Sequence, residues 1–238
     1  MWDNPRLLHA AANALGGLAA ALLVFAAAYA LSRSSLLPLR EITVLGTLAQ
    51  TSRSEIAHAT QAAASGNFLA ADLGAVRAAL EQLPWVRRVQ VRRVWPDRLE
   101  VALEEHVALA RWGEAGLVNT HGERFAATAA GPLPVFAGPA GTEAEVTRRY
   151  WRFAELLAPV DGTPERVILT SRRAWQLRLA GGLNLELGRD LAGEPVERRL
   201  ARFVSAYPQT LARMQRRHEY VDLRYPNGFA LRVPELNG

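Results

Sequence analysis

The sequence contains no cysteine and no lysine among its 238 residues, and both absences narrow what the chain can be. Without cysteine it has no disulfide, no thiol nucleophile and no cysteine-ligated metal site. Without lysine, all 28 of its basic residues are arginines, set against 23 acidic residues. These arginines are not concentrated in the single basic stripe that is typical of nucleic-acid-binding folds, so we expect no nucleic acid among the partners.

The sequence motifs of common enzyme classes are absent as well. There is no G-x-S-x-G nucleophile elbow, no G-x-G-x-x-G run and no glycine loop that could cradle a phosphate. The histidines do not have the spacing of a zinc site; they are His9, His58, His106, His121 and His218. We therefore expect a protein that is not an enzyme and that carries no cofactor or metal. A cell-wall-processing enzyme is the alternative, since scattered carboxylates could converge in the folded chain.

A stretch near the N-terminus carries no charge. No Asp, Glu, Lys or Arg lies between Arg6 and Arg33, and the most apolar part covers residues 10–31. As a helix this part would be roughly 33 Å long, close to the ~30 Å hydrocarbon thickness of a bilayer. It has no polar face, which disfavours a buried helix of a soluble protein. We predict a transmembrane helix at 10–31 that contacts the lipid bilayer, preceded by a short tail at 1–9.

A cleaved secretory signal is the alternative interpretation of this stretch, because Ala28-Tyr29-Ala30 fits the A-x-A cleavage pattern. The apolar run exceeds the roughly 7–15 residues of a signal core, which favours an uncleaved anchor. Charge does not decide the orientation, since Arg6 lies on one side and Arg33 and Arg40 lie on the other. Residues 33–98 hold nine arginines and five acidic residues, a surplus that fits attraction to anionic lipid or to an acidic partner.

Residues 37–106 show the pattern of a small α+β domain. Ser52-Arg53-Ser54-Glu55 fits a capping box, Asp72 is a good N-cap, and Pro84 disfavours helical geometry at the residue before it. Apolar and polar residues alternate in the later part of the domain, which is typical of strands with one buried face. The predicted elements are a strand at 39–44, helices over 52–64 and 72–83, and strands at 88–93 and 99–103.

Two further features of this domain bear on its surface and its hairpin. Arg87, Arg88, Arg92 and Arg93 form either a solvated sheet face or a docking surface for a partner. The Trp95-Pro96-Asp97 run lies between the two predicted strands, and we expect it to shape the hairpin, which is a folding role.

Residues 107–238 are predicted to form a second domain in which helices and strands are mixed. The sequence indicates a hairpin around Gly113 and Gly116, and Thr142-Glu143-Ala144-Glu145 fits a second capping box. Pro208 is expected to break or kink a long helix. The other elements are a helix from the capping box to about 158, a strand at 167–169, alternating strands at 175–179 and 183–187, and a helix over 195–215.

The chain ends with a predicted hairpin. Val221, Leu223 and Tyr225 would share one face, with Asp222 and Arg224 on the other, and Tyr225-Pro226-Asn227-Gly228 has the chemistry of a type I turn. Phe229, Leu231 and Val233 continue the alternation until Pro234. A proline here favours an edge strand, and an edge exposes N–H and C=O groups with which another chain can pair.

Several runs can be compared with a known family. In the first domain they are Leu83-Pro84-Trp85-Val86, Val91-Arg92-Arg93, Trp95-Pro96-Asp97-Arg98-Leu99 and Glu104-Glu105-His106. In the second domain they are Leu117-Val118-Asn119, Trp175, Leu187-Gly188-Arg189, Arg199-Leu200-Ala201-Arg202-Phe203 and Val221-Asp222-Leu223-Arg224-Tyr225 with Gly228. These runs resemble the FtsQ/DivIB family of bacterial cell-division proteins. The resemblance implies an α+β chain with a single N-terminal transmembrane helix, a POTRA domain at 37–106 and a mixed α/β "β domain" at 107–238 with a C-terminal edge hairpin.

The resemblance also implies a function. It is that of an essential divisome scaffold of the inner membrane at the division septum, with a cytoplasmic N-terminus and periplasmic domains. In the family the β domain binds FtsB and FtsL, and the POTRA and membrane regions are linked to FtsK, FtsW and FtsI, so that early and late division proteins are connected. An outer-membrane protein assembly or translocation factor with a POTRA domain is the alternative.

Partner-binding roles are carried over from the family to Arg224, Tyr225, Gly228 and Phe229, together with Arg189. Arginine and tyrosine are common at interface hot spots, where they could pair with a carboxylate or fill a pocket. The alternatives are hairpin packing for Tyr225 and Phe229, and turn geometry for Gly228.

Overall fold

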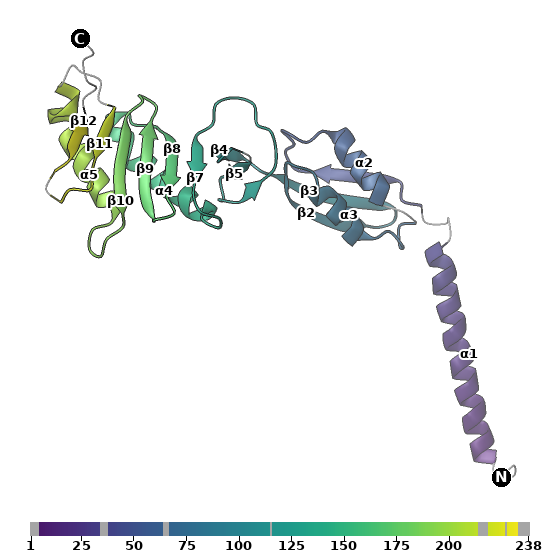
Figure 1. Ribbon diagram of the computed structural model, residues 1–238. Helices are drawn as coiled ribbons and strands as arrows, with labels where there is room; N and C mark the ends of the chain where they lie inside the picture. The colour runs from purple at the N-terminus through teal and green to yellow at the C-terminus, as the bar shows by residue number, and fades with distance from the viewer. Residues whose placement is uncertain are drawn as a thin grey trace. The chain divides into compact units, whose positions relative to one another are not determined.

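The computed structural model describes residues 5–33, 38–63, 67–114, 116–213, 219–226 and 228–232. The chain divides into two compact units, Met1–Glu105 and His106–Gly238, and each contains its own hydrophobic cluster (Figure 1). Some predicted features lie outside the described residues: the first part of the 1–9 tail, residue 37, the helix end near 215, His218, Asn227, Val233 and Pro234.

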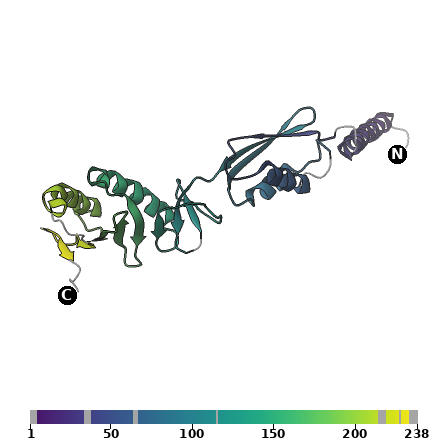
Figure 2. The same cartoon turned by 90° about the horizontal axis from the view of Figure 1, so that it is seen from above.

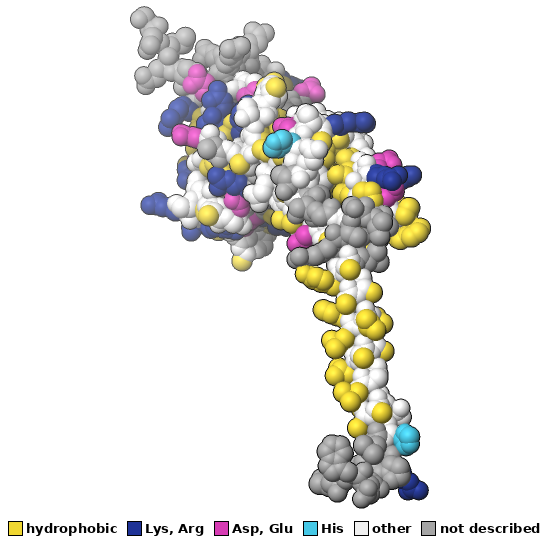
Figure 3. Space-filling model, turned by 90° about the vertical axis from the view of Figure 1, so that its right-hand side faces the viewer, with side chains coloured by type: hydrophobic (Ala, Val, Ile, Leu, Met, Phe, Trp, Pro, Cys, Tyr) yellow, Lys and Arg dark blue, Asp and Glu magenta, His cyan; other side chains and the backbone are white. Residues whose placement is uncertain are grey.

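The first element is the helix α1, Pro5–Arg33. Its segment His9–Ala30 is long and apolar enough to cross a membrane, with a mean hydropathy of 1.9, and none of it is buried in the structure. Hydrophobic side chains follow the surface of this helix (Figure 3). An unburied apolar helix of this length fits the predicted transmembrane segment.

The rest of the first unit is a three-stranded sheet with two helices. The elements are β1 Glu41–Leu45, α2 Arg53–Ala63, α3 Leu73–Glu81, β2 Val86–Val94 and β3 Arg98–Glu105. The strand order is β1-β3-β2, with β1 parallel and β2 antiparallel to β3. Both helices lie on one face of the sheet (Figure 2). The predicted order of strand, helix, helix, strand, strand is confirmed.

The predicted helix starts in this unit are confirmed by their hydrogen bonds. Glu55 N–H donates to Ser52 Oγ at 3.2 Å, and Ser52 N–H donates to the Glu55 carboxylate at 2.7 Å, which completes the capping box. The Asp72 carboxylate accepts from Gly74 N–H and Ala75 N–H. The end of α3 was predicted two residues too late, because Gln82 caps the helix and Leu83 closes a turn onto the carbonyl of Leu80.

The four arginines of β2 differ in their contacts, and three of them, Arg88, Arg92 and Arg93, are exposed. Arg87 pairs with Glu104 and Arg92 with Glu100, each at 2.5 Å, whereas Arg88 is exposed. The Arg93 guanidinium donates to three backbone carbonyls of the loop before α3, those of Phe68, Leu69 and Ala71. Arg93 therefore holds a loop in place, a role that the alternation pattern did not indicate.

The second unit contains one long mixed sheet. Its strands are β4 Ala108–Trp112, β5 Leu117–Asn119, β6 Arg124–Phe125, β7 Val135–Ala137, β8 Pro164–Leu169, β9 Ala174–Leu179, β10 Asn184–Arg189, β11 Tyr220–Asp222 and β12 Ala230–Arg232. The described strands follow the order β12-β11-β10-β9-β8-β7-β4-β5-β6. The helices are α4 Glu143–Leu157, α5 Val196–Ala206 and the 3-10 turns η1 Ala158–Val160, η2 Tyr207–Gln209 and η3 Leu211–Arg213.

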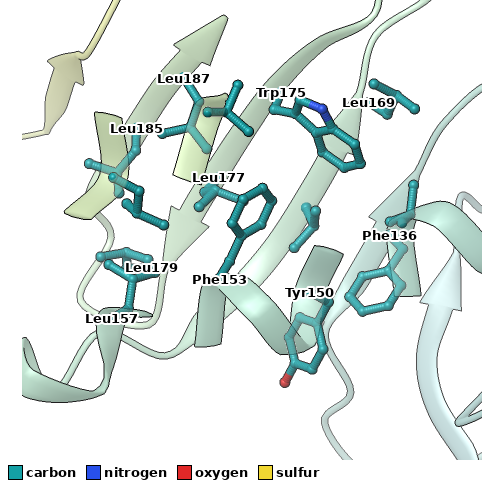
Figure 4. Packing of buried hydrophobic residues seen from close by; sticks show 14 of the residues in the cluster. Phe136, Tyr150, Phe153, Leu157, Leu169, Trp175, Leu177, Leu179, Leu185 and Leu187 are labelled. Carbon is teal, nitrogen blue, oxygen red and sulfur yellow. The ribbon is translucent and has the colours of Figure 1, made fainter. Parts of the chain in front are cut away.

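The core of this unit lies between the sheet and its two helices. Alternate residues of β9 and β10 point into this core, which fits the predicted alternation of leucines, and Trp175 packs edge-on against Phe153 of α4 with 5.6 Å between ring centroids. Figure 4 shows this packing for Phe136, Tyr150, Phe153, Leu157, Leu169, Trp175, Leu177, Leu179, Leu185 and Leu187. Burial of this leucine and aromatic face fixes which side of the sheet is covered.

Two helix predictions in this unit have different outcomes. Pro208 was expected to break or kink the last helix, and α5 does end at Ala206, with Pro208 in the turn η2. The capping box at Thr142 was wrong, because the Thr142 hydroxyl donates to the carbonyl of Pro139 at 2.6 Å and makes no cap bond to the helix. A nearby loop carbonyl competes for this hydroxyl, and the short motif does not reveal such a competitor.

Candidate functional site at the C-terminal sheet edge

The last strand lies at one end of the long sheet. β12 pairs in antiparallel register with β11, and among the described strands it has no neighbour on its other side. The neighbouring strand β11 lies parallel to β10 (Figure 1). The prediction that the chain ends in an edge hairpin is therefore confirmed for the described residues.

The hydrogen bonds of β11 identify the backbone groups that face outward from this edge. Asn184 N–H donates to the carbonyl of Glu219, and Leu223 N–H donates to the carbonyl of Glu186, each at 2.9 Å. Odd-numbered residues of β11 therefore direct their backbone groups to β10, and the even-numbered Tyr220 and Asp222 direct theirs to β12. The middle residue of β12, Leu231, then directs its N–H and C=O away from β11, toward the open edge.

The connection between β11 and β12 is longer than the sequence predicted. The register pairs Val221 with Leu231 and Asp222 with Ala230, so seven residues, 223–229, connect the two strands. The type I turn at 225–228 stays a prediction, because Asn227 lies outside the described residues. The cause of the longer connection is visible at Asp222, whose carboxylate accepts from the backbone N–H of Arg224 at 3.0 Å. A carboxylate that bonds to the backbone two residues later replaces a ladder bond and ends the strand.

The side chains of Asp222 and Arg224 strengthen this turn. Arg224 Nη2 donates to Asp222 Oδ2 at 2.6 Å and Arg224 Nε to Oδ1 at 2.9 Å. The side-chain hydrogen bonds from Arg224 lower the pKa of Asp222 below its ordinary value, although burial opposes the shift. The same pairing raises the pKa of Arg224. The Asp222 side chain is 8% exposed and that of Arg224 is 58% exposed, so the guanidinium is fixed at the surface.

The rest of the loop divides into an exposed part and a packed part. Tyr225 is 54% exposed, and a Cβ built on Gly228 would meet nothing within 4 Å, so the fold leaves room for a side chain there. Phe229 is half-buried and packs edge-on against Phe203 with 5.8 Å between ring centroids, which agrees with hairpin packing as its role. Tyr225 does not share the buried face of Val221, contrary to the alternation that was predicted.

Arg189, the fifth predicted site residue, lies at the end of β10 and is exposed. Its neighbour Gly188 has a φ of +75°, and a Cβ at that position would lie 2.9 Å from Arg224 Cγ. The structure therefore brings the end of β10 into contact with the Arg224 side chain. Four of the predicted site residues lie in one loop. The fifth, Arg189, lies next to Gly188, whose backbone lies against the Arg224 side chain of that loop.

Two residues of α5 support this site, although sequence reasoning gave them no role. Arg199 is 3% exposed and donates to the carbonyls of Leu187 at 2.7 Å and Arg189 at 2.8 Å. Arg202 donates to the carbonyl of Pro226 and pairs with Glu194 at 2.7 Å. A signal for Arg199 was present, because it occupies a core position on the apolar face of α5, three residues after the buried Val196. A buried arginine needs acceptors, and these carbonyls provide them.

In the described part of the chain there is no cluster of three or more His, Asp or Glu side chains that could hold a metal ion. The polar chemistry at the edge is instead that of strand pairing, with two exposed arginines and one exposed tyrosine.

Two family models match the chain. The model described as "POTRA domain, FtsQ-type" matches residues 37–106, and the one described as "Cell division protein FtsQ/DivIB, C-terminal" matches residues 110–224. A Burkholderia pseudomallei protein named cell division protein FtsQ is 42% identical over 98% of this chain and 94% of its own length. The proteins of that name from Nitrosospira multiformis and Escherichia coli K12 are 41% and 36% identical, over 98% and 82% of this chain and 99% and 72% of their own lengths.

Fold and comparisons together define a POTRA-containing cell-division protein with an N-terminal apolar helix that fits a membrane anchor. The chain belongs to the FtsQ/DivIB family of bacterial cell-division proteins.

Proposed function

We propose that this chain is a non-catalytic scaffold of the divisome, which binds FtsB and FtsL through the C-terminal sheet edge. Its place would be the inner membrane at the division septum, with the N-terminus in the cytoplasm and the domains at 37–106 and 107–238 in the periplasm. Contacts of the POTRA domain and the membrane helix with FtsK, FtsW and FtsI would connect early and late division proteins. Membership of the family favours this function over outer-membrane protein assembly.

The observation that carries the proposal is the open edge of β12. A partner strand can form backbone hydrogen bonds there with Leu231, the described residue whose N–H and C=O point outward. Tyr225 is an exposed aromatic in the loop that leads into β12, and the guanidinium groups of Arg224 and Arg189 can pair with acidic residues of the partner. Backbone pairing would supply affinity, and the side chains would supply specificity.

The test is co-purification of the full-length chain with FtsB and FtsL from membranes. Leu231→Pro removes one outward N–H and should weaken capture of FtsB by tenfold or more, a loss of about 1.4 kcal/mol. Leu231→Val changes the side chain but keeps the N–H, so this matched control should retain binding. Equal capture by both variants, with unchanged circular dichroism, would contradict strand addition.

A second pair of variants tests the loop. Tyr225→Ala removes an exposed aromatic anchor and should weaken FtsB capture by tenfold or more, in the range of an interface hot spot. Trp151→Ala removes an aromatic of similar exposure from α4 and should leave capture unchanged. If the two variants behave alike, Tyr225 is not part of the interface.

A further inference from the structure

Among the large hydrophobic residues that the structure describes, Trp95 is the most exposed, with 78% of its surface accessible. It lies in the connection between β2 and β3, where we expected it to shape the hairpin by packing. An indole ring so exposed buries little apolar area within the domain. The fold of the domain therefore does not explain why a tryptophan stands at this position, and the proposed edge interface in the other unit does not use it.

The position of Trp95 in the fold is tied to the start of β1. Arg40 N–H donates to the carbonyl of Asp97 at 3.0 Å, so the β2–β3 connection lies beside the residue that precedes β1. The helix α1 ends at Arg33, seven residues before Arg40. Seven residues span at most about 24 Å, which limits how far this connection can lie from the end of the candidate membrane helix.

A second exposed apolar residue lies at the same end of the domain. Leu69 is 42% exposed, in the loop that precedes α3. The Arg93 guanidinium binds carbonyls of this loop, and Arg93 lies close to the end of β2, from which the Trp95 connection begins. The Asn67 side chain also accepts from Leu69 N–H at 3.0 Å and Ala70 N–H at 2.9 Å, which fixes the shape of the loop.

Most arginines around these apolar residues pair with carboxylates, and the exception is Arg93, whose guanidinium binds backbone carbonyls. Arg92 pairs with Glu100 at 2.5 Å and Arg98 with Glu41 at 3.1 Å, while Arg40 lies 3.9 Å from Asp97. Paired arginines with long apolar stems can remain at a lipid headgroup layer, where tryptophan is enriched. A polypeptide partner that is recognised by charge would need several arginines without a carboxylate partner. A lipid interface, in contrast, accepts a surface whose arginines are mostly paired and that carries tryptophan and leucine.

We infer that this end of the POTRA domain, carrying Trp95 and Leu69, inserts into the headgroup region of the membrane that α1 enters. Its ligand is the lipid surface itself. The contact would hold the domain in one orientation against the bilayer, which a flexible tether alone does not do. This inference does not depend on the proposed binding of FtsB, because it concerns the other unit and the other end of the chain.

The sequence has no cysteine, so a single introduced cysteine is the only position to which a thiol-reactive label can attach. This makes a direct test possible. A nitroxide is attached to Ala70→Cys, next to Leu69, or to Gln82→Cys, an exposed position after the far end of α3. The full-length chain is reconstituted at high dilution in vesicles of phosphatidylethanolamine and phosphatidylglycerol. Collisions of the nitroxide with lipid-soluble oxygen and with a water-soluble nickel chelate are then compared.

We expect the label at position 70 to be several-fold less accessible to the nickel chelate than the label at position 82. Adding Trp95→Ala to the Ala70→Cys chain should raise nickel accessibility severalfold, while Trp151→Ala should not change it. Leu69→Ser is the second variant, for which a smaller increase is expected. Circular dichroism should be unchanged, because Trp95 is largely exposed.

Three results would overturn the inference. The first is that the label at position 70 is as accessible to the nickel chelate as the label at position 82. The second is that neither Trp95→Ala nor Leu69→Ser changes the accessibility of the label at position 70. Shielding that increases with the protein-to-lipid ratio would show that a second copy of the chain, rather than lipid, covers this end.

Discussion

The Asp222 carboxylate holds Arg224 twice, by the backbone N–H at 3.0 Å and by the guanidinium at 2.6 Å. This local pair ends β11, opens the loop before β12 and fixes a cation beside the sheet edge. Arg224 therefore enters any interface already ordered by its own chain, and a pre-ordered side chain loses less entropy when it binds.

Neutralising Asp222 should disorder this loop. In Asp222→Asn the amide keeps the shape of the carboxylate but loses the charge, so we expect faster amide hydrogen exchange over residues 223–226 and weaker FtsB capture. Glu219→Gln is the matched control, since the Glu219 side chain has no ion pair in the described structure. Unchanged exchange in Asp222→Asn would show that the backbone alone sets the loop.

Gly188→Ala should perturb Arg224 from the opposite side. Gly188 has a φ of +75°, and the added Cβ would lie 2.9 Å from Arg224 Cγ, so the arginine has to move. Gly193→Ala is the matched control, because Gly193 has a φ of +80° but nothing within 4 Å of its Cβ position. Both should lose about 1 kcal/mol of stability from backbone strain.

The two glycine variants should differ in their binding of FtsB. This difference separates the effect of backbone strain from the effect of displacing the Arg224 side chain. Only Gly188→Ala should weaken capture of FtsB, because only this variant moves Arg224. If Gly193→Ala lowers capture to the same extent, general loss of stability explains the effect. Thermal unfolding and co-purification, measured on the same preparations, distinguish the two outcomes.

Arg199→Ala should be the most destabilising of these variants, at about 3 kcal/mol or more. The buried guanidinium satisfies the carbonyls of Leu187 and Arg189, and its removal leaves both without that donor and creates a cavity. Arg198→Ala, at the exposed neighbouring position, should cost less than about 1 kcal/mol. Comparable unfolding midpoints for the two variants would contradict a structural role for Arg199.

The sequence revealed those parts of the fold that depend on local pattern. The Ser52 and Asp72 helix starts and the alternating leucines of β9 and β10 could be predicted because their partners lie a few residues away or on the same face. The edge position of β12 could also be predicted, since a nearby proline is poorly tolerated inside a sheet.

The polar side chains were predicted less well, because their partners are distant in the sequence. The Thr142 hydroxyl bonds to a loop carbonyl, and Arg93 and Arg199 bind carbonyls brought near by folding. Side chains with several possible partners are decided by tertiary neighbours, which periodicity does not specify. The edge position of the final strand was thus predicted from the sequence, whereas the contacts of α5 with the loop before that strand were not.

Glu105 provides the last prediction, which concerns pH. Its carboxylate accepts from the backbone N–H groups of Ala49 at 2.7 Å and Thr51 at 2.6 Å, in the segment that leads into α2. Burial raises the pKa of Glu105, but the hydrogen bonds from Thr51, Ala49 and Gln50 together outweigh it, so the pKa lies below its ordinary value.

Because the pKa of Glu105 is lower in the folded than in the unfolded chain, the ionised group stabilises the first unit above about pH 4.3, the ordinary value. This stabilisation should be lost as the pH falls from there through the lower folded pKa. Glu105→Gln should lower the free energy of unfolding by about 2 kcal/mol at neutral pH. It should also flatten the pH dependence of the protection against hydrogen exchange at residues 49–51. Glu104→Gln removes the ion pair with Arg87 and leaves the Glu105 hydrogen bonds in place, so it should keep the wild-type pH dependence. If protection against exchange at residues 49–51 falls in parallel in wild type and in Glu105→Gln on acidification, another carboxylate controls the acid sensitivity of this segment.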